Sequence, residues 1–153
     1  MSNSGSYITI EINSNLDKVL ENVDKIREKT LQQIGMGVQR SASRACPRDT
    51  GRLSNSITYA TQKKHSAVRG KAKISDGMQT GQAGDQYTVV VGTNVEYAAF
   101  VEMGHHQEVG RYVPAIGARL VREFVPGQAF LKPALESNTG NIRDIIQKNF
   151  NEL

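Results

Sequence analysis

The sequence predicts an α+β domain in which an antiparallel sheet is packed on one face by a long N-terminal helix and a C-terminal helix, with long loops. Three observations predict this class. Apolar residues recur at helical spacing over residues 16–42, β-rich segments lie on both sides of this stretch, and a second helical pattern closes the sequence. The 153 residues show no internal repeat, so we expect a single domain over residues 1–153.

The first expected elements are a short strand and a long helix. Residues 7–12 alternate polar and apolar side chains, which is the pattern of a strand with one buried face. A continuous apolar stripe of helical period follows, and this helix should end near Ala45, because Pro47 disfavours helical backbone at the residue before it. Gly35 and Gly37 weaken its middle and predict a kink or a close contact with another helix.

A turn, a strand and a loop are expected next. The turn covers residues 47–51, where proline fixes φ, aspartate and threonine bond to local amides, and glycine accepts a positive φ. Residues 56–61 then form a strand. Residues 62–85 show no sustained period and few large apolar side chains, so we expect a long mobile loop there.

A second strand and a short helix should complete the sheet region. Residues 86–92 carry the strongest strand signal in the chain, because they are rich in valine and other β-formers. The helix should run from Val95 to Met103 and end at Gly104. Tyr97 and Phe100 are three apart on one helical face, so we expect both to pack on the sheet.

The last third of the sequence predicts a second long loop and a final helix. The loop covers residues 105–125 and has strand-like character only at residues 111–113. The helix begins at Phe130 and is interrupted around residues 138–140. Pro133 stands near its start, where a missing N–H costs little.

Composition narrows the class of protein. Cys46 is the single cysteine, so no internal disulfide is possible and nothing indicates an oxidising compartment. The first residues lack the charged start and apolar run of a signal peptide. No stretch approaches the ~20 apolar residues that cross a bilayer. We therefore expect a soluble protein with no membrane partner, in a cytoplasmic setting.

A basic block is the main feature of the charge pattern. The net charge is only +4, but no acidic residue stands between Asp49 and Asp76. The cations of this stretch are Arg52, Lys63, Lys64, Arg69, Lys71 and Lys73. They are candidates for contacts with an acidic partner surface or a polyanion. A nucleic-acid-binding module using residues 63–73 stays open, although a block without aromatics grips phosphates and does not stack bases.

Catalytic and metal-binding patterns are weak. Cys46 would need a histidine and an acid nearby to act as a nucleophile, and a small residue that ends a helix explains it as well. His105 and His106 are adjacent and point in different directions, which does not suit a metal. The glycines at 77–81 lack the Lys-Ser/Thr of a phosphate loop. We expect no enzymatic activity, no cofactor and no metal.

Three motif segments carry a resemblance. Residues 46–57 read CPRDTGRLSNSI and include Pro47, Asp49, Thr50 and Gly51. Residues 91–104 read VGTNVEYAAFVEMG and include Gly92, Tyr97, Phe100, Glu102 and Gly104. Residues 126–135 read PGQAFLKPAL and include Phe130 and Pro133. In this order and spacing they resemble the tail-completion or head–tail joining family of long-tailed bacteriophages and prophages, whose members are often described as minor tail components.

The resemblance implies a structural virion protein at the head–tail junction. It implies a homo-oligomeric ring of six copies that completes the tail tube, meets the tail tube protein, and joins the tube to the head-completion or connector protein. DNA would pass through its channel only as cargo. The sequence departs from the family pattern in the long segments 62–85 and 105–125, which leaves open which surfaces contact neighbours.

Glu102 is one of the two acidic residues of the second motif, after Glu96. It would lie near the end of its helix, where the helix dipole disfavours a carboxylate. We therefore expect a salt bridge or hydrogen bond from Glu102 to a neighbour, and a weaker assembly in Glu102→Ala.

Overall fold

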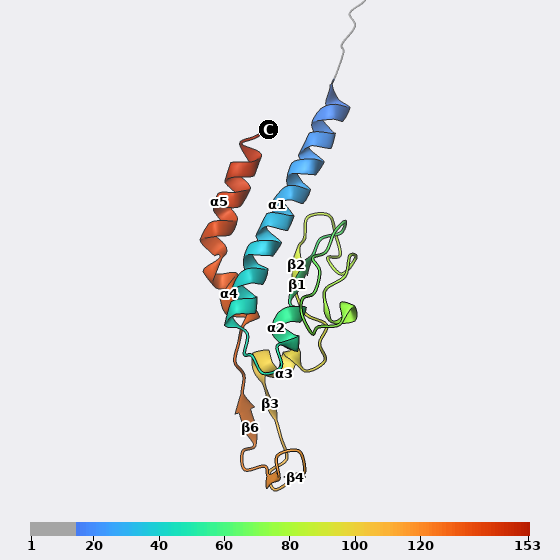
Figure 1. Ribbon diagram of the computed structural model, residues 1–153. Helices are drawn as coiled ribbons and strands as arrows, with labels where there is room; N and C mark the ends of the chain where they lie inside the picture. Colours follow the sequence, from blue (N-terminus) through green and yellow to red (C-terminus); the bar gives the residue numbers. More distant parts are fainter. Residues whose placement is uncertain (1–14) are drawn as a thin grey trace, which may run out of the picture.

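A long helix forms the centre of the structure, a computed structural model that describes residues 15–153. The small antiparallel sheet packs on one side of this helix and the C-terminal helices pack on another (Figure 1). The predicted α+β class is therefore confirmed. The strand predicted at residues 7–12 lies outside the described residues. Within residues 15–153, no helix is both long and apolar enough to cross a membrane.

Helix α1 (Leu16–Ala45) has the predicted bounds. At its end, Cys46 is extended and donates its N–H to the Ala42 carbonyl at 2.9 Å. Only the second half of α1 contributes to the core, where Val38 and Ala42 are at most 5% exposed. The first turns project beyond the body of the molecule (Figure 1), so the start of the predicted apolar stripe is exposed.

The turn after α1 leads through a short helix to the sheet. Gly51 has φ +79°, as the turn chemistry predicts, and α2 (Arg52–Ser56) follows. Strand β1 (Thr58–Ala60) then pairs antiparallel with β2 (Val90–Gly92), with Tyr59 opposite Val91. Both strands are shorter than predicted. Gly35 explains how closely α1 approaches them, because a Cβ at Gly35 would lie 2.7 Å from Tyr59 Cγ. The close contact of Gly35 is therefore with a strand and not with a helix.

The segment 62–85 is fastened to the sheet region. It contains a 3₁₀ turn, η1 (Ile74–Asp76), and two isolated bridges, which join His65 to Ala60 and Gly77 to Thr93. Met78 N also donates to Thr58 Oγ1 at 2.6 Å. The Gly77–Thr93 bridge and the Met78–Thr58 bond join residues that are 16 and 20 positions apart, so local composition did not reveal them.

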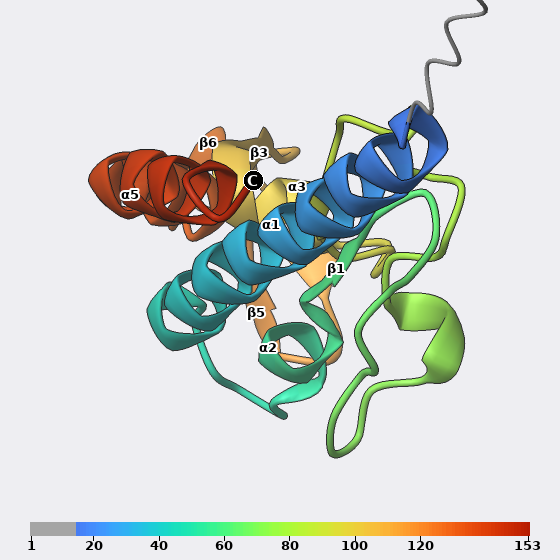
Figure 2. The same ribbon diagram turned by 90° about the horizontal axis from the view of Figure 1, so that it is seen from above.

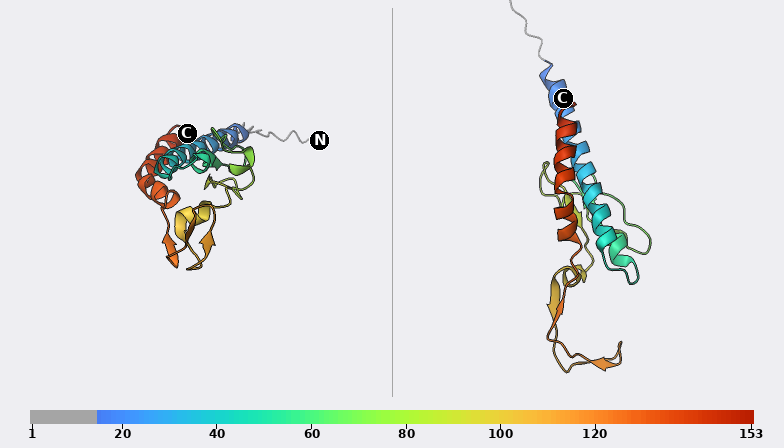
Figure 3. Two further views of the ribbon diagram at one scale, coloured as in Figure 1. Left: turned by 60° about the horizontal axis from the view of Figure 1, so that its bottom comes forward. Right: turned by 90° about the vertical axis from the view of Figure 1, so that its left-hand side faces the viewer.

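Residues 104–126 form a projecting β-ribbon and not the predicted irregular loop; we call this ribbon the arm. At its root, β3 (Gly104–His106) pairs with β6 (Phe124–Pro126). Toward its tip, β4 (Tyr112–Val113) pairs with β5 (Ala118–Arg119). The arm follows α3 (Ala98–Met103) and extends away from the body (Figures 1 and 3). Strands of two or three residues are too short to give a period, which is why the sequence resembled a loop.

The C-terminal helices complete the structure. Helices α4 (Leu131–Ser137) and α5 (Thr139–Phe150) meet at Asn138, within the predicted interruption. Seen from above, α1 lies between α5 and the sheet region (Figure 2). The buried Asn149 amide donates to Thr30 Oγ1 at 2.9 Å and to Gln33 Oε1 at 2.7 Å. These bonds fix the register of α5 against α1.

Candidate assembly interface

The three motif segments share one hydrophobic core. The first contributes Leu53 and Ile57, the second Val95 and Ala98, and the third Phe130, which is fully buried. All five side chains pack with the C-terminal half of α1. The motifs therefore hold the end of α1, the root of the arm and the start of α4 in a fixed relation.

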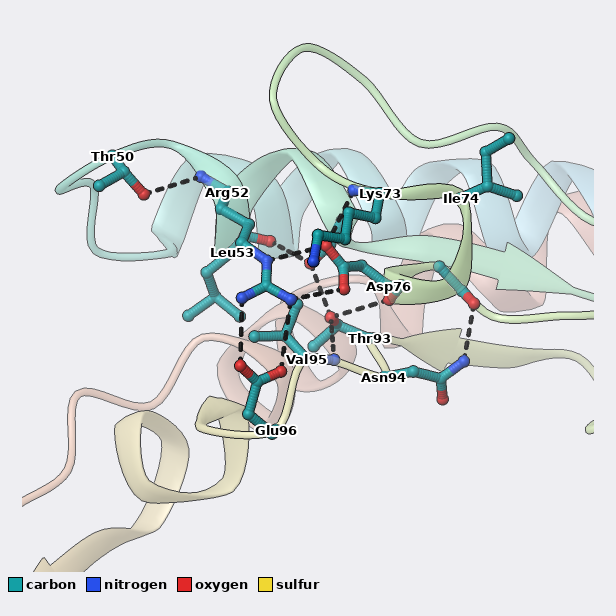
Figure 4. A network of polar contacts seen from close by, with 12 residues as sticks. Thr50, Arg52, Leu53, Lys73, Ile74, Asp76, Thr93, Asn94, Val95 and Glu96 are labelled. Carbon is teal, nitrogen blue, oxygen red and sulfur yellow. Dashed lines mark hydrogen bonds and ion pairs between the residues drawn. The ribbon is translucent and has the colours of Figure 1, made fainter.

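Arg52 joins two of these motifs to the segment 62–85 (Figure 4). Its Nε and Nη2 donate to the two Asp76 carboxylate oxygens at 2.9 and 2.8 Å, and Nη1 donates to Glu96 Oε1 at 3.1 Å. The hydrogen bonds from Arg52, followed by one from the Lys73 N–H, lower the pKa of the buried Asp76 to about 2. The guanidinium that we expected to meet a partner is thus engaged within its own chain.

Glu102 also finds its partners within the chain. Its Oε2 accepts the N–H groups of Phe130 and Leu131 at 2.7 and 3.0 Å, and its Oε1 accepts that of Lys132 at 3.0 Å. The carboxylate caps the N-terminus of α4, where the helix dipole favours a negative charge. Burial raises the pKa of Glu102, but the three backbone hydrogen bonds outweigh it and leave the pKa below its ordinary value.

The other predicted contact cations are all exposed. These are Lys63, Lys64, Arg69, Lys71 and Lys73. Lys63 and Lys64 line a shallow groove together with Glu21 and Glu28 of α1, so acidic groups lie near them. Arg69 lines a different groove, with Arg40 of α1.

Phe100 does not pack on the sheet as we expected, because it is 58% exposed. Helix α3 begins at Ala98, three residues later than predicted, since the Thr93 hydroxyl accepts the Val95 N–H at 3.1 Å and closes a turn first. Ala98 and Val101 then form the face toward the core, and the Phe100 ring lies against His105 with centroids 5.7 Å apart. Sequence spacing alone could not locate this delayed helix start.

An apolar groove lies beside Phe100, and we call it the root groove. It has a volume of about 460 Å³. It is lined by Pro47, Tyr97, Phe100, Val101, His105, Val125, Pro126 and Gln128. All three motif segments contribute to it. The groove is open and mostly apolar, which suits the burial of apolar side chains from another protein.

Cys46 has the environment of a packing residue. It is 4% exposed, and burial raises the pKa of its thiol to about 11. A reactive cysteine needs the opposite shift, because the thiolate is the nucleophile. This observation favours the interpretation of Cys46 as a small residue at the end of α1.

An elongated fold with exposed apolar side chains toward its two ends is typical of a protein that works through contacts with other proteins. The sequence profile of the family described as "Bacteriophage HK97-gp10, putative tail-component" matches residues 10–104. The match covers more than half of the chain, so the chain belongs to this family of bacteriophage tail components. No curated protein and no solved structure matched the chain.

Family membership supports a structural role in the virion. The matched residues include the first two motif segments and end at Gly104, the first residue of the arm. Most of the arm and both C-terminal helices therefore lie beyond the matched part of the chain.

Proposed function

We propose that six copies of this protein form a ring at the head–tail junction, which completes the tail tube and joins it to the capsid connector. The observation that carries this proposal is the presence of two apolar surfaces at opposite ends of an elongated molecule (Figures 1 and 3). A ring of this kind needs surfaces for contacts between its own copies as well as for contacts with the structures it joins. Contacts with other tail components are in keeping with the family to which the chain belongs.

The first of these surfaces is the N-terminal end of α1. Leu16, Val19 and Leu20 are 52–60% exposed there, and Phe150 and Leu153 of the C-terminal region are 41% and 60% exposed. The second surface is the arm with the adjoining end of α3. Clustered exposed apolar side chains mark interaction sites in soluble proteins, so both surfaces are suited to neighbouring subunits or rings.

The exposed cations of the segment 62–85 would act at the same junction. We propose that Lys63, Lys64, Arg69, Lys71 and Lys73 meet acidic neighbours or the DNA that passes through the channel, while Arg52 holds this segment in place. The alternative is a nucleic-acid-binding module built on residues 63–73. Such a module would lose DNA affinity steeply as salt rises and would give a defined footprint.

Electron microscopy of particles produced without this protein tests the proposed function. We expect filled heads and separate tails, and complementation with the wild-type gene should restore joined virions. Normally joined particles in the absence of the protein would refute the proposal.

A further inference from the structure

The strands of the arm are too few and too short to make it stable on its own. It is two strands wide, and isolated two-stranded hairpins are at best marginally stable in water. Its large side chains are poorly covered: Val109, Tyr112, Ile116 and Val121 are 54–82% exposed. Apolar groups therefore face solvent along much of its length, and covering them would stabilise both the arm and whatever covers it.

The root of the arm holds it pointing away from the body. Gly104 has φ +83°, and its backbone packs directly against that of Gly127, where a Cβ on either glycine would clash. Gln128 N donates to the Val101 carbonyl at 2.7 Å, and Glu102 caps α4 beside this contact. A tip held in this direction does not fold back onto its own root, so its apolar side chains are accessible to a second molecule (Figure 3).

The chemistry of the tip matches that of the root groove. The tip, residues 108–121, carries exposed apolar side chains, and Glu108 and Arg111 stand beside them in the sequence. The root groove is mostly apolar, and a second groove that shares its wall is lined by Arg48 and Asp49. Within the described part of the chain, none of these four charged residues forms a salt bridge. Arg119 also stands at the tip, so both surfaces carry charges of both signs beside an apolar patch.

We propose that the tip of the arm of one copy binds in the root groove of a second copy of this chain. Seven large apolar side chains from Phe100 to Phe124 are exposed, and they belong to the tip, the root and the groove together. At roughly 100 Å² each, one tip and one groove supply about 700 Å² in total, which is the size of a weak contact and lies below the ~1,600 Å² of a stable interface. Each copy gives one tip and offers one groove, so the contact is head-to-tail and forms a closed ring when the rotation between copies closes. Only the ring, and not the contact itself, rests on the proposed function.

Sedimentation velocity of the full chain over a range of concentrations tests this contact. The tip variant is Ile116→Asp with Val121→Asp, and the groove variant is Phe100→Asp. All three side chains are more than half exposed, so the fold should persist, which circular dichroism checks. We expect concentration-dependent association of the wild type and at least a tenfold loss of affinity in each variant. Leu135→Asp, at an exposed apolar position on α4, is the matched control and should associate like the wild type.

Mixing the two variants gives the decisive result. The groove variant retains an intact tip and the tip variant retains an intact groove, so the mixture should form a one-to-one pair although neither variant associates alone. The proposal is overturned if folded variants associate like the wild type, if the mixture stays monomeric, or if the wild type is monomeric at every concentration. Any of these results leaves the head–tail junction proposal to its own test, the appearance of particles lacking the protein.

Discussion

Replacing the Glu102 carboxylate tests how the arm root and α4 are joined. In Glu102→Ala the N–H groups of Phe130, Leu131 and Lys132 lose their common acceptor. Phe130 is fully buried, so its N–H has little access to water as a replacement. We expect the variant to fold with a loosened start of α4.

The structure gives the size of this effect. Loss of a helix cap costs about 0.5–2 kcal/mol, and a hydrogen bond to a charged group is worth about 1.5–3 kcal/mol. Because two of the three N–H groups retain partial access to water, we expect a total loss of about 2–3 kcal/mol for Glu102→Ala. In a domain of this length that lowers Tm by about 4–12 °C. Glu102→Gln keeps one acceptor oxygen and should lose about half as much.

Thermal unfolding of the wild type and Glu102→Gln at several pH values is the assay. The pKa of Glu102 is lower in the folded protein than its ordinary value of 4.5. Its stabilisation is therefore fully present above pH 4.5 and is lost as the pH falls through the folded-state pKa. The stability difference between the two proteins should shrink in that range. Glu123→Gln, on the exposed arm, is the control. Equal Tm values for Glu102→Ala and the wild type at pH 7 would refute the capping role.

Three further predictions follow from single contacts. Gly35→Ala should lose about 1–3 kcal/mol of stability, because the added Cβ meets the Tyr59 ring. In Gly37→Ala the added Cβ makes an ordinary 3.6 Å contact, so this variant should gain up to about 1 kcal/mol from helix propensity. Chemical denaturation measures the stability of both variants, and equal effects would contradict the contact of Gly35 with Tyr59. Asp76→Asn should destabilise the fold, because Arg52 loses its charged partner, and the wild-type contribution should be lost only as the pH falls from 3.8 toward 2; acid titration followed by circular dichroism checks this. Cys46 should react with a thiol reagent at neutral pH far more slowly in the native than in the denatured protein, and equal rates would contradict its burial.

Local patterns predicted α1 and the C-terminal helices well. The stripe of α1 repeats over many turns, and Pro47 marks its end chemically, so both bounds were readable. The interruption of the C-terminal helix was readable because residues 138–140 are poor helix formers. The positive φ of Gly51 followed from turn chemistry in the same way.

Long-range contacts set the limits of prediction. The bidentate Arg52–Asp76 pair joins residues 24 positions apart, and Glu102 meets amides 28–30 positions away. No local pattern specifies such partners, so both residues resembled surface charges. The arm was missed because its strands are short and its side chains are exposed on a ribbon without a core face.

The central position of α1 has a consequence for synthesis of the protein on the ribosome. Thr30 of α1 accepts a hydrogen bond from Asn149, which is made 119 residues later. At about 5–20 residues per second, one side of α1 stays uncovered for roughly 6–24 s after it has been made. Throughout this interval the sheet can already dock on the other side, and α4 and α5 arrive last to close the fold. A nascent chain stalled before Phe130 would therefore expose an apolar helix face to which chaperones bind.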